Sequence, residues 1–187
     1  MMDAKTRIVS HADRPQALEV VRAAFEQDLE AQLVERMWTD GSIIAECVTH
    51  ADGRIVSYAA ISPATIAFGS EAVPALALAP VAVAPESQRN GFGEQVVRAT
   101  IDAAFARHPG RLMFVLGDPA YYRRFDFRPA AAVGYQWEGG DVGDAFQVRS
   151  KDRASAPGIM AAAGSDAERR SIVRYCNAFS IFRQETP

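Results

Sequence analysis

One segment constrains the fold of this chain more than any other, because it joins an apolar strand to an amphipathic helix through a glycine-bearing loop. It reads Val81-Ala82-Val83-Ala84-Pro85-Glu86-Ser87-Gln88-Arg89-Asn90-Gly91-Phe92-Gly93, and the helix follows directly. The first backbone N–H groups of a helix have no partner within the helix, and the helix dipole adds partial positive charge at the same end. Gly91 and Gly93 have no Cβ and let a ligand approach the backbone closely. The segment therefore predicts a site for a phosphate or pyrophosphate group.

The spacing of this loop separates it from two better-known phosphate loops. It reads Gln-x-x-Gly-x-Gly, and no Lys-Ser or Lys-Thr follows, which argues against a nucleoside-triphosphate P-loop. It is also not Gly-x-Gly-x-x-Gly, so the dinucleotide-binding pattern is absent. A plain strand-to-helix turn, with glycines that serve geometry alone, is the alternative interpretation.

Composition narrows the class of protein. A length of 187 residues fits one domain, and a hydrophobic fraction of 49% is enough for a core. The net charge is −3 without a basic block, which argues against nucleic acid as a partner. The apolar runs are too short to span a bilayer, and no signal peptide is visible. We therefore expect a cytoplasmic protein without a membrane partner.

The two cysteines, Cys47 and Cys176, lie far apart in the sequence and lack metal-type spacing. This favours a pair of free thiols over a single disulfide. No metal site is expected.

Hydrophobic periodicity predicts a mixed set of strands and helices. Strands are expected at 7–10, 43–49, 55–68, 73–83 and 111–116, and helices at 13–25, 29–37, 96–108 and 119–125. The strand at 111–116 is expected to be buried on both faces and parallel to a neighbour. Weaker patterns predict strands at 137–148 and 172–182, with a mobile loop at 150–166. Pro63 and Pro80 have no N–H to donate, so each predicts a bend, an edge or an end of strand pairing.

A second segment stands out for its aromatic residues. It reads Leu116-Gly117-Asp118-Pro119-Ala120-Tyr121-Tyr122-Arg123-Arg124-Phe125-Asp126-Phe127-Arg128-Pro129 and places a short helix directly after a buried strand. Tyr121 and Tyr122 are adjacent, so a helix turns them to different sides. Only one of them can face a given site.

Taken together, the two segments resemble the GNAT (GCN5-related) N-acetyltransferases. That family has a Gln/Arg-x-x-Gly-x-Gly/Ala loop after a Val-x-Val strand, and a later Tyr-x-x-Phe/Leu-Gly-Phe signature. The resemblance covers about Thr6 to Pro129, and the segments 78–83 and 173–175 resemble its YhbS-like branch. Asp126 stands where the signature has glycine, which leaves open whether the change impairs the site. Aspartate tolerates left-handed backbone better than most residues.

The resemblance implies a layered α/β fold, with a central mixed, mostly antiparallel sheet flanked by helices. It also implies a splayed strand pair at the acyl-CoA site. We expect a single domain over residues 1–187, with a core at 6–149. Residues 150–187 would supply a C-terminal loop and a last strand.

The resemblance further implies that the chain is an enzyme. It would transfer an acetyl group from acetyl-CoA to a primary amine by direct attack in a ternary complex. Tyr122 aligns with the tyrosine that protonates the leaving thiolate, and Tyr121 serves as an internal control. Backbone groups of the strand would pair with pantetheine and polarise the thioester carbonyl. The cofactor-binding residues would be Val81, Ala82, Val83, Gln88, Arg89, Asn90, Gly91, Phe92 and Gly93.

Several features stay open on sequence alone. The strand before the loop carries no acid, so the general base is not identified. Glu46, His50 and Asp118 could act directly or through water, although a solvated or structural role is favoured for each. An acidic segment at 26–35 could attract a cationic amine, although a solvated helix face is favoured. The acceptor could be a small amine, an antibiotic, a peptide N-terminus or a protein lysine. A homodimer is also open, because dimers are common in this family.

Two other functions compete with a general amine acetyltransferase. One is a non-catalytic acyl-CoA-binding sensor or scaffold. The other is a toxin-type or regulatory acetyltransferase that acts on a macromolecule. For the latter, the net negative charge argues against RNA as the substrate.

Overall fold

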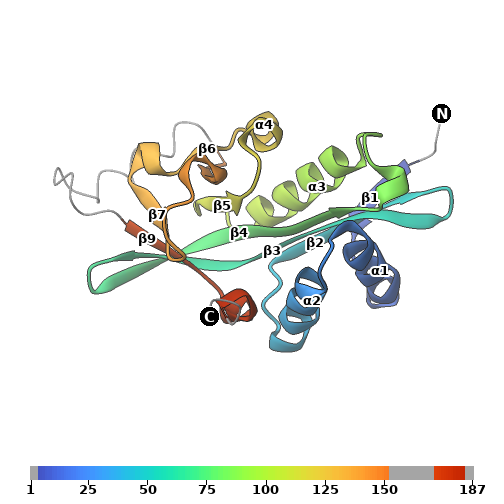
Figure 1. Cartoon of the computed structure of the whole chain (residues 1–187), viewed down its shortest axis with the longest axis horizontal. Coiled ribbons are helices and arrows are strands. Elements are labelled where there is room, and N and C mark those ends of the chain that lie inside the picture. Colours follow the sequence, from blue (N-terminus) through green and yellow to red (C-terminus); the bar gives the residue numbers. More distant parts are fainter. Residues whose placement is uncertain (1–3, 152–170, 184–187) are drawn as a thin grey trace. The chain divides into compact units, whose positions relative to one another are not determined.

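The computed structural model describes residues 4–151 and 171–183, which form two compact units. Within the described residues, the first unit comprises 4–62, 79–106 and 177–183, and the second comprises 63–78, 107–151 and 171–176. Figure 1 traces the chain and labels the helices α1–α4 and most of the strands. Strands β3 and β4 contribute residues to both units.

The first unit is built on antiparallel strands covered by helices on both faces. Strand β2 (Ala45–Ala51) pairs with β1 (Ala4–Ile8) on one side and with β3 (Arg54–Phe68) on the other. Helices α1 (Arg14–Ala24) and α2 (Leu29–Asp40) lie on one face, and α3 (Phe92–Arg107) lies on the opposite face (Figure 1). The β2–β3 turn has Asp52 at φ 51° and Gly53 at φ 79°, so the strands expected at 43–49 and 55–68 form a hairpin.

The second unit carries the remaining strands. Its elements are the first part of β4 (Glu71–Val83), β5 (Met113–Leu116), α4 (Pro119–Tyr122), β6 (Arg128–Pro129), β7 (Tyr135–Trp137), β8 (Phe146–Arg149) and β9 (Ser171–Tyr175). Strand β4 pairs with β5 in parallel, as predicted for 111–116, and β8 pairs antiparallel with both β5 and β6. Leu116, at the end of β5, is 40% exposed, so the prediction of burial on both faces fails at that residue.

Short 3₁₀ turns connect these elements. They are η1 (His11–Asp13), η2 (Pro85–Ser87), η3 (Arg123–Phe125), η4 (Ala131–Val133), η5 (Gly143–Ala145) and η6 (Asn177–Arg183).

The strand order is β1-β2-β3-β4-β5-β8-β6, with β9 paired to β3 and to β7. Antiparallel pairs dominate and β4–β5 and β7–β9 are parallel, so the predicted mixed, mostly antiparallel sheet is confirmed. In the second unit, the core under this sheet is apolar and aromatic. Phe114 stacks on Phe146 at 5.3 Å between ring centroids and meets Tyr135 edge-on at 5.4 Å.

Pro63 marks a change of pairing partner along β3. The strand pairs with β2 up to Ile61 and with β9 from Ala64 onward, so the residue without an N–H lies between the two ladders. Pro80 likewise lies outside the ladder between β4 and β5, because it follows the residues of β4 that pair with β5. The parallel register with β5 comprises Leu76–Met113 and Ala77–Phe114, and β4 then continues to Val83.

Two predictions for the C-terminal third are wrong in detail. A strand at 137–148 is replaced by β7 and β8, because the glycine-rich stretch between them forms turns and η5. The strand predicted at 172–182 ends at Tyr175 and gives way to η6. Most of the loop predicted at 150–166 falls outside the described residues.

Both cysteines, Cys47 and Cys176, are free thiols. Among the described residues, no helix has the length and apolarity needed to cross a membrane. In the same part of the chain, no cluster of His, Cys, Asp and Glu side chains is arranged to hold a metal ion.

Candidate functional site

The predicted anion loop begins at the end of β4 and ends at the N-terminus of α3. Arg89 and Gly91 both adopt left-handed backbone, with φ of 62° and 83°. A turn of this kind directs successive N–H groups toward one concave surface, which is a geometry that binds anions. A β-carbon built on Gly91 meets no atom within 4 Å, so the backbone is open to a ligand there. This backbone conformation is compatible with the predicted anion site, which stays a prediction.

Hydrogen bonds hold the loop from within. The Asn90 Nδ2 donates to the carbonyl oxygens of Ser87 and Gln88, both at 3.2 Å. The Gln88 Nε2 donates to the carbonyl of Val83 at 3.4 Å, which ties the loop back to β4. These two side chains thus shape the loop, while Arg89 is exposed beside it.

The first turn of α3 is anchored on the sheet by Phe92. Its side chain is buried with Ala51 and Val56, and its carbonyl oxygen accepts a hydrogen bond from Ser57 Oγ at 3.3 Å. The first helical hydrogen bond runs from the Gln95 N–H to the Gly91 carbonyl at 3.1 Å. Only the backbone of Phe92 is therefore available to a ligand, because its ring belongs to the core.

The end of β4 presents backbone rather than reactive side chains. Ala82 is buried, whereas Val81 and Val83 are partly exposed. The Ala84 N–H donates to the Val56 carbonyl of β3 at 2.9 Å, so β3 supports this end of the strand. Any contact that a ligand makes at residues 81–83 has to involve the main chain and the two valine side chains.

Tyr122 lies at the end of α4 in an aromatic cluster. Asp118 begins the helix, and its Oδ1 accepts a hydrogen bond from the Ala120 N–H at 2.9 Å. The Tyr122 ring meets Tyr121 and Phe127 edge-on, with centroid distances of 5.0 and 5.8 Å. Burial raises the pKa of Tyr122 above its ordinary value, and the nearby Tyr121 adds to the shift. The phenol is therefore a protonated donor at neutral and moderately alkaline pH.

A second tyrosine near Tyr122 was not assigned any role from the sequence. Burial raises the pKa of Tyr175 on β9, and the second cause of the shift is Tyr122. The two phenols are thus close enough to interact electrostatically, although they lie far apart in the chain. The pairing of β9 with β3 brings Tyr175 to this place.

Asp126 adopts the left-handed conformation that a glycine would favour. Its φ is 63°, and its N–H donates to the Arg123 carbonyl at 3.0 Å to close the turn. The turn expected after Tyr122 is therefore present despite the substitution of glycine by aspartate.

Each candidate general base holds a defined structural contact. The Glu46 Oε2 accepts hydrogen bonds from Trp38 Nε1 and Tyr58 Oη, both at 2.8 Å, and the carboxylate is buried. His50 Nε2 lies 2.9 Å from Arg7 Nη2, and Asp118 caps α4. None of the three therefore has the environment of an uncommitted base.

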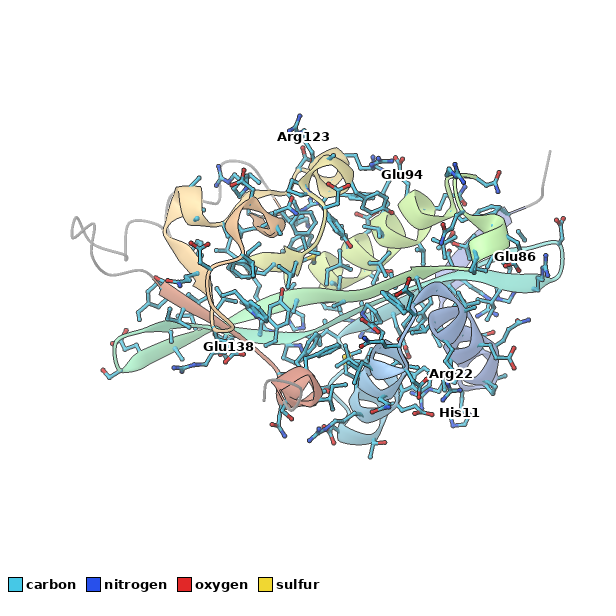
Figure 2. The ribbon with its side chains drawn as sticks, viewed as in Figure 1. His11, Arg22, Glu86, Glu94, Arg123 and Glu138 are labelled. Atoms are coloured by element: carbon cyan, nitrogen blue, oxygen red, sulfur yellow. The ribbon has the colours of Figure 1, made fainter. Side chains whose placement is uncertain are left out.

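The acidic segment at 26–35 forms ion pairs on the helix surface. Arg22 contacts Asp28 at 3.0 Å and Glu35 at 3.4 Å, and all three side chains are exposed (Figure 2 labels Arg22). This agrees with the favoured interpretation of a solvated helix face.

Comparison with known proteins agrees with the fold. Residues 5–130 match the family model of the acetyltransferase (GNAT) domain, and the chain belongs to this family. The uncharacterized N-acetyltransferase YhbS of Escherichia coli K12 is 32% identical over 145 residues, which cover 76% of this chain and 84% of YhbS.

Two solved structures share the fold. Escherichia coli YhbS in complex with CoA superposes with a TM-score of 0.79 at 28% identity, over 96% of this chain and 93% of that one. A GNAT family acetyltransferase of Brucella melitensis in complex with acetyl-CoA gives a TM-score of 0.67 at 23% identity, over 94% and 97% of the two chains. The predicted GNAT fold and YhbS-like resemblance are thus confirmed.

Proposed function

We propose that this protein transfers an acetyl group from acetyl-CoA to a primary amine by direct attack in a ternary complex. The observation that carries the proposal is the open loop at the N-terminus of α3, where Gly91 has left-handed backbone and free space around its Cα. The CoA and acetyl-CoA complexes of two proteins with this fold support the choice of ligand.

The residues present fit the pyrophosphate of an acyl-CoA. Backbone N–H groups from Gln88 to Gly93 would donate to it, aided by the positive end of the helix dipole. Arg89 would add a cationic contact, because it is exposed next to the loop. Asn90 and Gln88 would act indirectly, because their amides already hold the loop in shape.

Acetyl-CoA supplies a thioester, whose sulfur departs as a thiolate when an amine nitrogen attacks the acetyl carbon. The strand at Val81–Val83 would bind the pantetheine arm through its backbone, and one of its N–H groups would stabilise the oxygen that becomes negative. Tyr122 would donate its phenol proton to the thiolate, so that the C–S bond breaks as a thiol forms. The phenolate then regains a proton from solvent.

The proton lost by the amine would go to water, because Glu46, His50 and Asp118 are all held in structural contacts. A lysine-like amine has a pKa of about 10.4, so only a small fraction of it is neutral at pH 7. We therefore propose that the reaction rate rises with pH as the acceptor deprotonates. The raised pKa of Tyr122 keeps its phenol protonated over the pH range in which the acceptor amine loses its proton.

The test is release of free thiol from acetyl-CoA, measured with a panel of acceptors. The panel comprises polyamines, aminoglycosides, peptides with free N-termini and lysine peptides, and Tyr122→Phe serves as the control. Thiol release that depends on one acceptor class and is lost in Tyr122→Phe supports the proposal. Tight binding of acetyl-CoA without acceptor-dependent release favours the alternative, a non-catalytic acyl-CoA sensor or scaffold.

Two further proposals accompany this function. We propose that residues 1–187 act as one domain and that the protein works in the cytoplasm, and a homodimer stays an open possibility.

A further inference from the structure

A cationic pocket lies in the second unit, and none of its lining residues belongs to the anion loop. Its volume is about 340 Å³, and it opens between the turn after α4 and strands β6 and β8. Four cationic side chains line it, and they are Arg123, Arg128, Arg149 and Lys151. One acidic residue, Asp126, lines it as well. The chain as a whole has a net charge of −3, so this local excess of positive charge differs from the rest of the surface.

The structure holds Arg149 in position within the pocket. Its Nη1 donates to the Phe125 carbonyl at 2.8 Å, and its guanidinium lies 5.9 Å from the centre of the Phe127 ring. Strand β8 carries Arg149, and the paired strand β6 begins at Arg128, opposite Val148. Two arginines are thus placed on neighbouring strands by the sheet itself.

The remaining cations lie at the rim. Arg123, Arg128 and Lys151 are exposed, and Arg123 extends outward from the turn after α4 (Figure 2). Asp126 forms no salt bridge with any residue that the structure describes. The pocket therefore combines one fixed guanidinium with three adaptable cations and a buried apolar wall at Phe127.

This arrangement selects for a compact anion of high charge. Planar guanidinium groups match the oxygens of a phosphate in bidentate geometry, and a phosphate ester carries about −1.5 to −2 charges at pH 7. A volume near 340 Å³ is at the lower end for small-molecule sites, which span roughly 300–1,000 Å³. We propose that this pocket binds the phosphate group of a small organic phosphate, with an apolar part of the ligand against Phe127.

Binding of inorganic phosphate to the full-length protein at low ionic strength, followed by ³¹P NMR, tests the site. Arg128→Gln should weaken phosphate binding by about tenfold, because it removes a charge-assisted hydrogen bond. Asp126→Asn should strengthen it about two- to fivefold, because it removes the repulsive carboxylate and suits the same left-handed backbone. Arg174→Gln, an exposed arginine on β9 outside the pocket, should bind phosphate like the wild type.

The first two variants are expected to change the affinity for phosphate in opposite directions. This separates an effect on binding from an effect on folding, because a damaged fold does not increase affinity. The proposal is overturned if the wild type shows no saturable phosphate binding. It is also overturned if Arg128→Gln binds phosphate as well as Arg174→Gln does.

A second comparison identifies the source of the phosphate. If the 3′-phosphate of CoA occupies the pocket, Arg128→Gln should weaken CoA binding and leave dephospho-CoA binding unchanged. If a separate phosphorylated molecule occupies it, Arg128→Gln should leave both unchanged while inorganic phosphate binding still falls. Phosphate binding requires no acetyl transfer, so this proposal and the proposed function can fail independently.

Discussion

A β-carbon built on Gly117 would lie 2.5 Å from Cε2 of Tyr122, closer than real β-carbons approach any neighbour. The Tyr122 ring therefore packs directly against the backbone of Gly117. Two hydrogen bonds hold the turn at Gly117 in place. The Gly117 N–H donates to the Ala145 carbonyl at 2.9 Å, and its own carbonyl accepts from Gln147 Nε2 at 3.1 Å. The absence of a side chain at Gly117 thus sets where the phenol of Tyr122 can lie.

Replacement of Gly117 by alanine should displace the Tyr122 ring, because the hydrogen-bonded turn cannot readily move away. We expect a loss of about 1–3 kcal/mol in the free energy of unfolding, together with reduced turnover. Gly110→Ala is the matched control, since a β-carbon at Gly110 meets no atom within 4 Å. Urea denaturation of both variants measures the difference. Equal stability of the two would show that the ring adjusts freely.

Tyr122→Phe should lower kcat by about a hundredfold and leave the Kd for acetyl-CoA within about twofold, because general acids contribute roughly 10²–10⁴-fold. Tyr121→Phe should retain most activity. In the wild type, kcat/KM should rise with pH toward the pKa of the acceptor amine, without a decline caused by Tyr122. Burial keeps that phenol protonated well above pH 10. Equal losses in the two variants would contradict the assignment of Tyr122 as the acid.

The sequence predicted the strand–loop–helix order at residues 81–93 and the short helix of Tyr122 well, because both depend on short local patterns. Gly91 is left-handed as its loop position requires, and α4 begins at Pro119 behind the capping Asp118. Pro63 also behaves as predicted, since its missing N–H falls between two ladders.

Features that depend on distant partners could not be predicted in the same way. The Asp13 carboxylate binds Arg7 of β1 and the Ser10 backbone N–H, and hydrophobic periodicity does not indicate these contacts. Tyr175 comes near Tyr122 only through the pairing of β9 with β3. The cationic pocket likewise depends on the pairing of β6 with β8, which brings the two sequence segments 123–129 and 149–151 together. Hydrophobic periodicity describes single elements and does not indicate which strands pair with each other.

Position 126 should accept glycine but not a β-branched residue, because the φ of Asp126 is 63°. We expect Asp126→Gly to leave the free energy of unfolding unchanged or raise it by up to about 1 kcal/mol. Asp126→Val should lower it by about 1–2 kcal/mol through backbone strain. Chemical denaturation of the pair measures both effects. A valine variant as stable as the glycine variant would show that this turn does not require left-handed backbone.

Asp13 should stabilise the fold in a pH-dependent way. The bidentate contact with Arg7, at 2.6 and 2.7 Å, lowers the pKa of this carboxyl well below its usual range. Its stabilisation is therefore complete above about pH 4, the unfolded value, and is lost as the pH falls toward the folded pKa.

We expect Asp13→Asn to cost about 2 kcal/mol at pH 7 and progressively less below pH 4, as measured by urea denaturation. Asp28→Asn is the control, because the Arg22–Asp28 pair is exposed and such pairs contribute about 0–1 kcal/mol. A cost for Asp13→Asn that does not change between pH 7 and pH 3 would contradict this assignment.

The most direct test of the central claim is calorimetric titration of acetyl-CoA into the wild type, Gly91→Asp and Gly91→Asn, with ATP and NAD as control ligands. Asparagine and aspartate both tolerate the left-handed backbone at φ 83°, and they differ only in the charge placed at the loop. We expect one saturable acetyl-CoA site in the wild type, much weaker binding of ATP and NAD, and at least a tenfold greater loss of affinity in Gly91→Asp than in Gly91→Asn. Equal affinities of the two variants, or binding of ATP as tight as that of acetyl-CoA, would contradict the assignment of residues 88–93 as the acyl-CoA pyrophosphate site.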